Sequence, residues 1–497
     1  QAYDNTIPMI LTNKFGMSQA WSGAIMALDN VLALFMLPLF GAISDKHHSK
    51  WGRRTPFIVV GTLIAAVMLI ALSFVDNAQL HHISDVAAID DPAALETIYD
   101  READETLLTP GGQKFVLSRQ FTKEEFTQIR SQITVDGAAV TNPDYTNYVM
   151  PARQACAWDA TAKSPVTLVF FIALLLVILV SMSVFRSPAV ALMPDVTLKP
   201  LRSKANALMG SAGGILVLVL GMVFATSAVR NSLMSYTGYF AVIAAIMLAA
   251  LVVFMLTVRE NEWAAEMQQQ SVELGLEDKE EAATGERKLS VDEVKSLIFL
   301  LLSIVLWFFG YNAVTSKYSV YASNILHKDY NLTLIIAQAA AIISYLPVGF
   351  IASKVGRKKT ILAGVVMLTA AFTTASFMSA ESPTMLMNAM FALAGIAWAT
   401  INVNSFPMVV EMCSGGNVGK YTGFYYTASM AAQVATPMLS GARKAADRGQ
   451  HQEHDRPPAG WCRRHRSRVH GAGLCDHAVR PPRRQQARGQ TGAGSSG

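Results

Sequence analysis

The sequence predicts an all-α membrane protein built from two related six-helix halves. Hydrophobic residues make up 52% of the 497 residues and charged residues only 15%, whereas a soluble chain usually carries about a quarter charged residues. The apolar residues gather in runs of about twenty, the length that an α-helix needs to cross a bilayer. Short stretches of the first half recur in the second, which is why we expect two halves.

Ten apolar runs are long enough to span a membrane, and a shorter one precedes them. The short run, 1–12, is too short for a core of about 30 Å at about 1.5 Å per residue. Because the chain begins with Gln, we expect the start of this helix to be missing. The full runs are 20–44, 56–75, 166–185, 205–228, 236–258, 297–315, 333–352, 360–380, 384–404 and 418–441. The short run and the ten full runs make eleven helices, and a second half of six helices requires a twelfth. Twelve helices are therefore expected, with the first cut short and the last missing.

The basic residues set the expected orientation. They concentrate after the second, fourth and eighth spans, and cytoplasmic loops carry an excess of Lys and Arg. We therefore expect a multi-pass protein of the plasma membrane, with the loops after helices 2, 4, 6, 8 and 10 in the cytoplasm. The mixed-charge stretch 259–295 becomes a cytoplasmic linker between an N-terminal half, 1–258, and a five-helix C-terminal half, 296–441.

The repeat also predicts an insert. "GFIASKVGRKK" echoes the stretch that begins at Gly41, with Gly41 on Gly349, whereas Pro188 falls on Pro407. The two offsets, 308 and 219, differ by 89 residues, and a polar stretch of 90 residues, 76–165, lies between the third and fourth spans. It carries 14 acidic and 7 basic residues. We expect an external, partly folded cap.

The tail, 442–497, breaks the apolar pattern. It holds 12 Lys and Arg against 4 Asp and Glu, and no twelfth span appears. A basic tail that binds anionic lipid is one interpretation. We favour a frameshift after about Gly441, and we assign the tail no function.

The stretch "GAISDKHHSKWGRRTPF" places several charges in a short turn between two spans. Its basic residues alone would set topology, but Asp45 at the helix end suggests more. It can pair with a nearby arginine or with a helix N-terminus of the other half, closing the cytoplasmic side until the inside opens. Ser353 replaces the acid in the second copy, so we expect a one-sided lock. The gating candidates are Gly41, Asp45, Gly52, Arg53, Arg54, Asp195, Gly349, Gly356, Arg357 and Glu411.

This stretch resembles the signature loop of the major facilitator superfamily. The longer pattern "SKWGRRTPF" resembles the glycoside–pentoside–hexuronide cation symporters, and most of all their sucrose–proton symporter members. "RSPAVALMPD", 186–195, is similar to the fourth-helix motif of that group. The resemblance implies secondary active transport with proton coupling. The acids of the melibiose-carrier branch are replaced here by Ala33 and Leu37, which makes a sodium site of that type doubtful.

Two carboxylates are expected inside the membrane. Asp4 and Asp29 both lie nine residues from the outer end of their spans, roughly 13 Å deep at about 1.5 Å per residue. Ionisable residues at this depth are functional candidates, and we take both as proton-coupling candidates. The alternative is a structural acid hydrogen-bonded to Asn5 or Asn30.

Sugars are recognised by aromatic faces and hydrogen-bonding groups. Trp398 and Asn402 are four residues apart and share a helix face, as do Trp307 and Tyr311. The alternatives are aromatic packing between helices and, for Arg186, snorkelling to the interface. The substrate-binding candidates are Asn30, Arg186, Trp307, Tyr311, Asn312, Trp398, Asn402 and Asn404.

Together these features predict a proton-coupled importer of a disaccharide or glucoside, such as sucrose or maltose, that works by alternating access. The alternatives are a sodium- or proton-coupled carrier of another small solute, a non-transporting sensor, and a product that cannot fold. We expect no enzyme activity, because neither a nucleotide loop nor a catalytic constellation is present. The expected partners are a sugar, a proton and the bilayer. We expect no cofactor, metal or nucleic acid, and a monomer.

Overall fold

The computed structural model describes residues 2–135, 138–225, 233–276, 289–324, 330–379, 381–413 and 415–454. The chain divides into two compact units, Gln1–Met438 and Leu439–Gly497. The first unit contains the first half of the helical bundle, the insert, and the second half as far as Met438. The last helix begins in the first unit and ends in the second.

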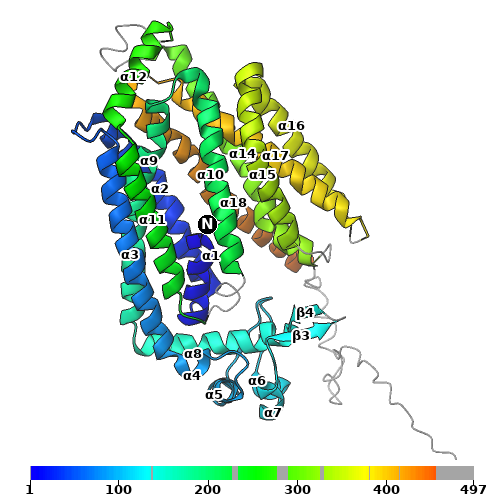
Figure 1. Ribbon diagram of the computed structural model, residues 1–497. Helices are drawn as coiled ribbons and strands as arrows, with labels where there is room; N and C mark the ends of the chain where they lie inside the picture. Colours follow the sequence, from blue (N-terminus) through cyan, green and yellow to red (C-terminus); the bar gives the residue numbers. More distant parts are fainter. Residues whose placement is uncertain are drawn as a thin grey trace, which may run out of the picture. The chain divides into compact units, whose positions relative to one another are not determined.

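Long helices lie side by side through the first unit (Figure 1). The first half comprises α1 (Ala2–Met9), the π-helix η1 (Ile10–Lys14), α2 (Gln19–Lys46), α3 (Thr55–His82), α9 (Val166–Asp195), η3 (Lys199–Leu201), α10 (Arg202–Ala225) and α11 (Thr237–Thr257). The second half comprises α14 (Val291–Asn324), α15 (Tyr330–Val355), α16 (Arg357–Ser376), α17 (Thr384–Val410), η4 (Gly415–Asn417) and α18 (Val418–His454). Among the described residues, eight helices are long and apolar enough to cross a membrane. The all-α membrane fold is therefore confirmed.

Several helices run past the limits that hydropathy predicts. The third span was expected to end at residue 75, but α3 continues to His82. The seventh was expected over 297–315, and α14 covers Val291–Asn324. Hydropathy locates only the apolar part of a helix, and a helix continues into water where polar residues follow. α18 likewise runs to His454, and the tail from residue 455 onward lies outside the described residues.

The insert between α3 and α9 folds around its own core. Its elements are α4 (Ser84–Ala87), α5 (Pro92–Glu102), β1 (Leu107–Leu108), β2 (Lys114–Phe115), α6 (Leu117–Gln120), α7 (Lys123–Thr127), β3 (Gln132–Val135), β4 (Ala138–Thr141), η2 (Tyr145–Val149) and α8 (Met150–Lys163). The strands form two antiparallel hairpins, with Leu107 opposite Phe115 in the first and Gln132 opposite Thr141 in the second. Leu95, Ile98 and Phe126 are fully buried in the core.

Buried polar contacts join the insert to the first half. Lys14 Nζ lies 2.6 Å from Asp76 Oδ1 and 2.7 Å from Asp76 Oδ2, and both side chains are 0% exposed. Gln79 then donates to the Lys14 carbonyl oxygen and to the Thr161 hydroxyl of α8, each at 2.9 Å. Asp76 was expected in the polar insert, but it lies within α3 as part of the bundle. The end of the first unit that carries α4–α8 is called the insert end below.

The linker after α11 begins with a helix, α12 (Glu260–Glu273). Figure 1 shows α12 at the opposite end of the first unit from α4–α8. This second end, called the α12 end below, also carries the loop between α2 and α3, because Asn261 Nδ2 donates to the carbonyl oxygens of Ser49 and Lys50.

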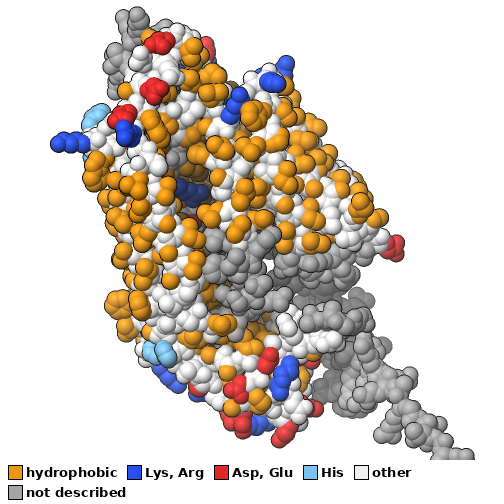
Figure 2. Space-filling view, in the orientation of Figure 1, with side chains coloured by type: hydrophobic (Ala, Val, Ile, Leu, Met, Phe, Trp, Pro, Cys, Tyr) orange, Lys and Arg blue, Asp and Glu red, His pale blue; other side chains and the backbone are white. Residues whose placement is uncertain are grey.

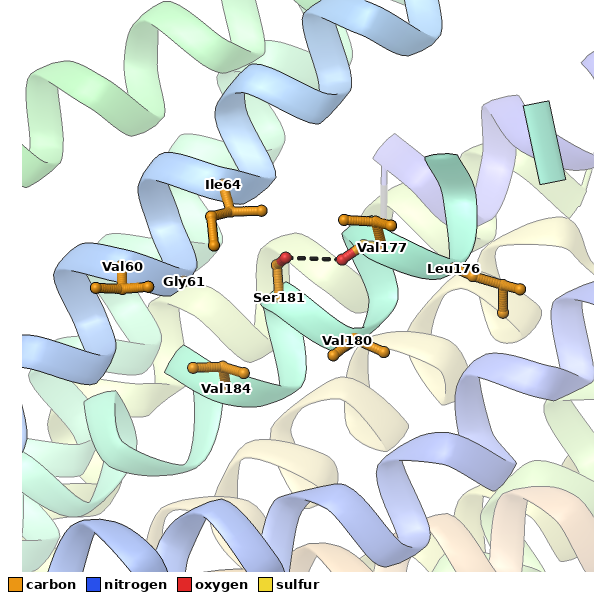
Figure 3. Close-up of a pocket in the computed structure, with 8 residues that line it drawn as sticks. All are labelled: Val60, Gly61, Ile64, Leu176, Val177, Val180, Ser181 and Val184. Carbon is orange, nitrogen blue, oxygen red and sulfur yellow. Dashed lines mark hydrogen bonds between the residues drawn. The ribbon is translucent and has the colours of Figure 1, made fainter. Parts of the chain in front are cut away.

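The outer surface of the helices is apolar. Figure 2 shows hydrophobic side chains covering the visible helix faces, with charged side chains gathered toward the ends. A groove of about 370 Å³ runs between α3 and α9 and is lined by Val60, Gly61, Ile64, Leu176, Val177, Val180, Ser181 and Val184 (Figure 3). The hydroxyl group among these lining residues, Ser181 Oγ, donates to the Val177 carbonyl oxygen at 2.7 Å. Because its lining side chains are almost all apolar, this groove suits contact with lipid chains rather than the binding of a polar solute.

Candidate functional site

A buried arginine organises the α12 end. Arg54 is 0% exposed, and its Nε donates to Asp195 Oδ2 at 2.9 Å, while Nη2 donates to Asp45 Oδ1 at 2.5 Å. Arg53 adds a second contact to Asp195, at 2.7 Å. Burial alone would lower the pKa of the Arg54 guanidinium, but the charges of Asp195 and Asp45 raise it above its ordinary value. We call Asp45, Arg53, Arg54 and Asp195 the Arg54 network.

Asp45 also joins the two halves. Its Oδ1 accepts from Gly419 N and its Oδ2 from Lys420 N, each at 2.8 Å. These two residues lie in the first turn of α18, whose amide groups have no partners within the helix. The positive end of the helix also favours a carboxylate. Asp45 therefore contacts both partners that the sequence suggested, an arginine and a helix N-terminus of the other half.

Glycines allow this close contact. A Cβ built on Gly41 would lie 2.2 Å from the carbonyl oxygen of Gly419, far inside van der Waals contact. Gly52 and Gly356 hold equivalent turns after α2 and α15, with φ of +114° and +97°, a conformation that favours glycine. Gly349 packs its backbone against Ala207 of α10.

Gly41→Ala is expected to separate α2 from α18 and lower the melting temperature, because the added methyl group meets backbone rather than a flexible side chain. Gly23→Ala is the matched control on the same helix, since no atom of the described part of the chain lies within 4 Å of its Cβ position. The control should gain stability, because alanine is favoured over glycine in a helix by roughly 0.5–1 kcal/mol. Thermal unfolding of the purified protein measures both. Equal melting temperatures would contradict the close contact.

The second copy of the motif also joins the halves, so the expectation of a one-sided lock is wrong. Among the described residues, Ser353 donates to the Gly349 carbonyl oxygen of its own helix and to no residue of the first half. Arg357 instead pairs with Glu411 at the end of α17, and it donates to Ser203 Oγ at 2.6 Å and to the Lys199 carbonyl oxygen at 2.7 Å. The cross-half contact in this copy comes from the arginine, which reaches further than a hydroxyl group.

A polar cavity of about 430 Å³ lies between the halves. Four sequence candidates line it, namely Arg186, Asn312, Trp398 and Asn402. The other lining residues are Val190, Asn206, Phe308, Phe406, Tyr425, Tyr426, Ser429, Met430 and Gln433. The Arg186 guanidinium lies 5.1 Å from the centre of the Tyr426 ring, within reach of a cation–π contact. The described lining of the cavity thus presents aromatic faces, amides, hydroxyls and the cation of Arg186.

Trp307 and Tyr311 support the wall of this cavity. Both rings pack on Trp398, with centroids 5.1 Å and 4.0 Å away. Asn404 is fully buried and donates to the Thr400 carbonyl oxygen, and it does not line the cavity. Asn30 is also outside the lining. These residues are not placed to touch a solute in the cavity in this conformation.

Of the two acids expected inside the membrane, Asp29 has a described side chain and Asp4 does not. Asp4 lies in α1, and its side chain is outside the described residues. Asp29 lies in α2, is half-buried, and is not among the residues that line the cavity. Among the residues that the structure describes, no carboxylate lines the cavity.

The contributions of α18 and of Glu260 were not predicted from the sequence. Tyr425, Ser429 and Gln433 follow one another at intervals of four residues, so they share a helix face, and this spacing was a usable signal. Glu260 accepts hydrogen bonds from the backbone amides of Arg53, Arg54 and Thr55. The sequence pattern that points to Glu260 is weaker. The helix that starts at Thr55 has no capping side chain of its own before Pro56, so its first amides need a partner from elsewhere in the chain.

Comparisons with known proteins agree with this architecture. A family model described as Major Facilitator Superfamily matches residues 154–442, and one described as MFS/sugar transport protein matches residues 2–81. Sucrose transport proteins SUC3 and SUC4 of Arabidopsis thaliana are 39% and 36% identical over 59 residues. Each match covers 12% of this chain and only 10% and 12% of those relatives.

Two solved structures share the fold. A proton:xylose symporter, XylE, bound to 6-bromo-6-deoxy-D-glucose, matches with a TM-score of 0.51 and 15% identity over 90% of this chain and 86% of its own. A bacterial homologue of the iron transporter ferroportin, in an outward-facing state, matches with a TM-score of 0.50 and 12% identity over 88% and 86%. The first family model covers more than half of the 497 residues. The chain therefore belongs to the major facilitator superfamily, a family of membrane transporters and not of enzymes.

Proposed function

We propose that the chain is a proton-coupled symporter of a disaccharide or glucoside, of the sucrose or maltose type, that works by alternating access. The cavity between the halves carries this proposal. Its volume of about 430 Å³ falls in the range of roughly 300–1,000 Å³ that is usual for small-molecule sites. The short matches to sucrose transport proteins favour the same class of solute.

The lining of the cavity suits a sugar. Trp398, Tyr425 and Tyr426 offer ring faces for the apolar side of a pyranose. Asn312 Nδ2 is buried and has no hydrogen-bond partner among the described residues. A buried donor left unpaired is costly, so a hydroxyl oxygen of the solute is its natural acceptor. Arg186 adds a fork of donors from α9.

Proton coupling and orientation are part of the proposal. Asp29 and Asp4 are the proposed proton carriers, because carboxylates within a membrane span favour such roles. The α12 end would face the cytoplasm of a plasma-membrane protein, since the loop with Lys46, Lys50 and Arg53 lies there. The halves are held together at that end, so release of solute into the cell requires those contacts to break.

External alkalinisation tests the proposal. Unbuffered cells that express the chain receive disaccharides one at a time, and one sugar is expected to raise the external pH. Asp29→Asn should abolish this rise, and Arg186→Gln should weaken or abolish it. Asp292→Asn is the control, because this acid is 90% exposed at the start of α14. No rise with any sugar, with normal membrane insertion, would favour a sodium-coupled carrier or a sensor.

A further inference from the structure

Glu260 is buried at the start of the linker helix α12. Only 3% of its surface is exposed. Its Oε1 accepts from the backbone amides of Arg53 and Arg54, each at 2.8 Å. Its Oε2 accepts from the amide and the hydroxyl of Thr55, each at 2.8 Å. One carboxylate from the linker therefore takes up the amides of three consecutive residues in the loop between α2 and α3.

The reason for this contact lies in the start of α3. The first amides of a helix have no partners within it, and Arg54 at the N-cap supplies no side-chain cap. A carboxylate at this position satisfies the amides and interacts favourably with the positive end of the helix. Gly52 makes room for it, because a Cβ there would lie 2.1 Å from Glu260 Oε2.

The backbone segment that Glu260 binds, residues 53–55, also carries the two arginines of the Arg54 network. Arg53 and Arg54 have their amides bound to Glu260, while their side chains extend to Asp195 and Asp45. Glu260 itself lies 205 to 207 residues along the chain from the amides it binds. Asn261 adds two hydrogen bonds to the same loop, to the carbonyl oxygens of Ser49 and Lys50. The linker thus fixes the loop from which both guanidinium groups project.

We propose that Glu260 is the positioning residue of the Arg54 network, and that the linker between the halves thereby sets how readily the α12 end opens. Loss of the carboxylate frees the amides of residues 53–55, and Arg54 can then no longer be held against Asp45 and Asp195 together. The inference rests on alternating access, which is part of the proposed function, but not on the identity of the solute.

Cys413 provides a native reporter of opening. It is 7% exposed and packs between Ala191 of α9 and Val418 of α18, at the contact between the halves. Burial raises the pKa of its thiol to about 12. Since the thiolate is the reactive form, Cys413 should react slowly with N-ethylmaleimide while the halves are closed and faster once they part.

The experiment measures the labelling rate of Cys413 in membranes, in a chain with Cys156→Ala, Cys462→Ser and Cys475→Ser. Glu260→Gln removes the charge and keeps the size. It is expected to raise the labelling rate about tenfold, because the loss of one charge-assisted hydrogen bond shifts an equilibrium by about that factor. Glu262→Gln is the matched control, because this acid lies on the same helix with a side chain 67% exposed. The control should stay at the parent rate.

Transport gives the second readout. Glu260→Gln should lower the maximal rate of uptake and leave KM nearly unchanged, because Glu260 does not line the cavity. Glu260→Asp keeps the charge and should recover part of both effects.

Labelling of Glu260→Gln at the parent rate would overturn the proposal. Where Glu260→Gln fails to insert, Asn261→Ala replaces it, with a smaller increase expected and an unchanged rate again counting against the proposal. Labelling needs no solute, so this result stands even if no sugar is transported.

Discussion

Arg54→Met is expected to destabilise the folded chain by about 3–5 kcal/mol, because two buried carboxylates lose their shared partner. The side chains of Asp45 and Asp195 are 3% and 1% exposed, so water cannot replace the guanidinium without opening the structure. Asp45 would keep the amides of α18, and Asp195 would keep Arg53. Arg53 compensates Asp195 alone, and the amides of α18 carry no full charge, so Asp45 is left buried without its cation. Thermal unfolding of the purified protein in detergent measures the change.

Two further variants sharpen this test. Arg54→Lys keeps the charge but offers one ammonium group in place of a planar fork, so it should recover only part of the loss. Lys50→Met removes a charge from the same loop at an exposed position, and surface changes of this kind usually stay within about 0.5 kcal/mol. If Arg54→Met melts at the same temperature as Lys50→Met, the buried network contributes no stability.

Lys14→Met is expected to have an effect of similar size at the insert end. It would leave Asp76 buried without its cation, a change that typically costs about 3–5 kcal/mol. Lys14 also donates to the Met234 carbonyl oxygen at 2.8 Å and lies 4.5 Å from the centre of the Tyr236 ring. Its removal therefore loosens the contact of η1 with the segment that leads into α11.

A double replacement separates the charge from the packing. Lys14→Met with Asp76→Leu removes both charges and keeps apolar volume, and such pairs are often as stable as the original. We expect most of the lost melting temperature to return. Lys163→Met, an exposed lysine at the end of α8, is the control for charge alone. A double variant as unstable as Lys14→Met would show that the side chains act through something other than their charges.

The sequence predicted those parts of the fold that depend on local pattern. Apolar runs located the long helices, and the repeat of the Gly41 stretch pointed to Asp45 as a contact between the halves. It misled at Arg357, because matching Ser353 to Asp45 ignored how far the neighbouring arginine reaches. The contact of Arg357 with the first half becomes visible only when the length of its side chain is compared with its distance from Ser203 and Lys199 in the folded protein.

Contacts between distant segments could not be predicted in the same way. Glu260 binds a loop more than 200 residues earlier, and nothing in its neighbourhood repeats. Asp76 was assigned to the polar insert because hydropathy cannot tell an exposed acid from one paired within a bundle. In the cavity, four of the eight substrate-binding candidates line the wall, because spacing identifies a shared helix face but not which way that face points.

The attachment of the insert has a practical consequence for imaging. Membrane proteins of this size are difficult to align in electron micrographs, because detergent surrounds almost all of their ordered mass. Here Gln154 of α8 donates to Asn13 at 2.8 Å, and Gly16 is so close to Trp158 that a Cβ would lie 2.2 Å from its amide nitrogen. The insert is thus fastened to the first half at several points. It offers a built-in fiducial mark against which movement of the second half can be measured, without a fused tag or an antibody fragment.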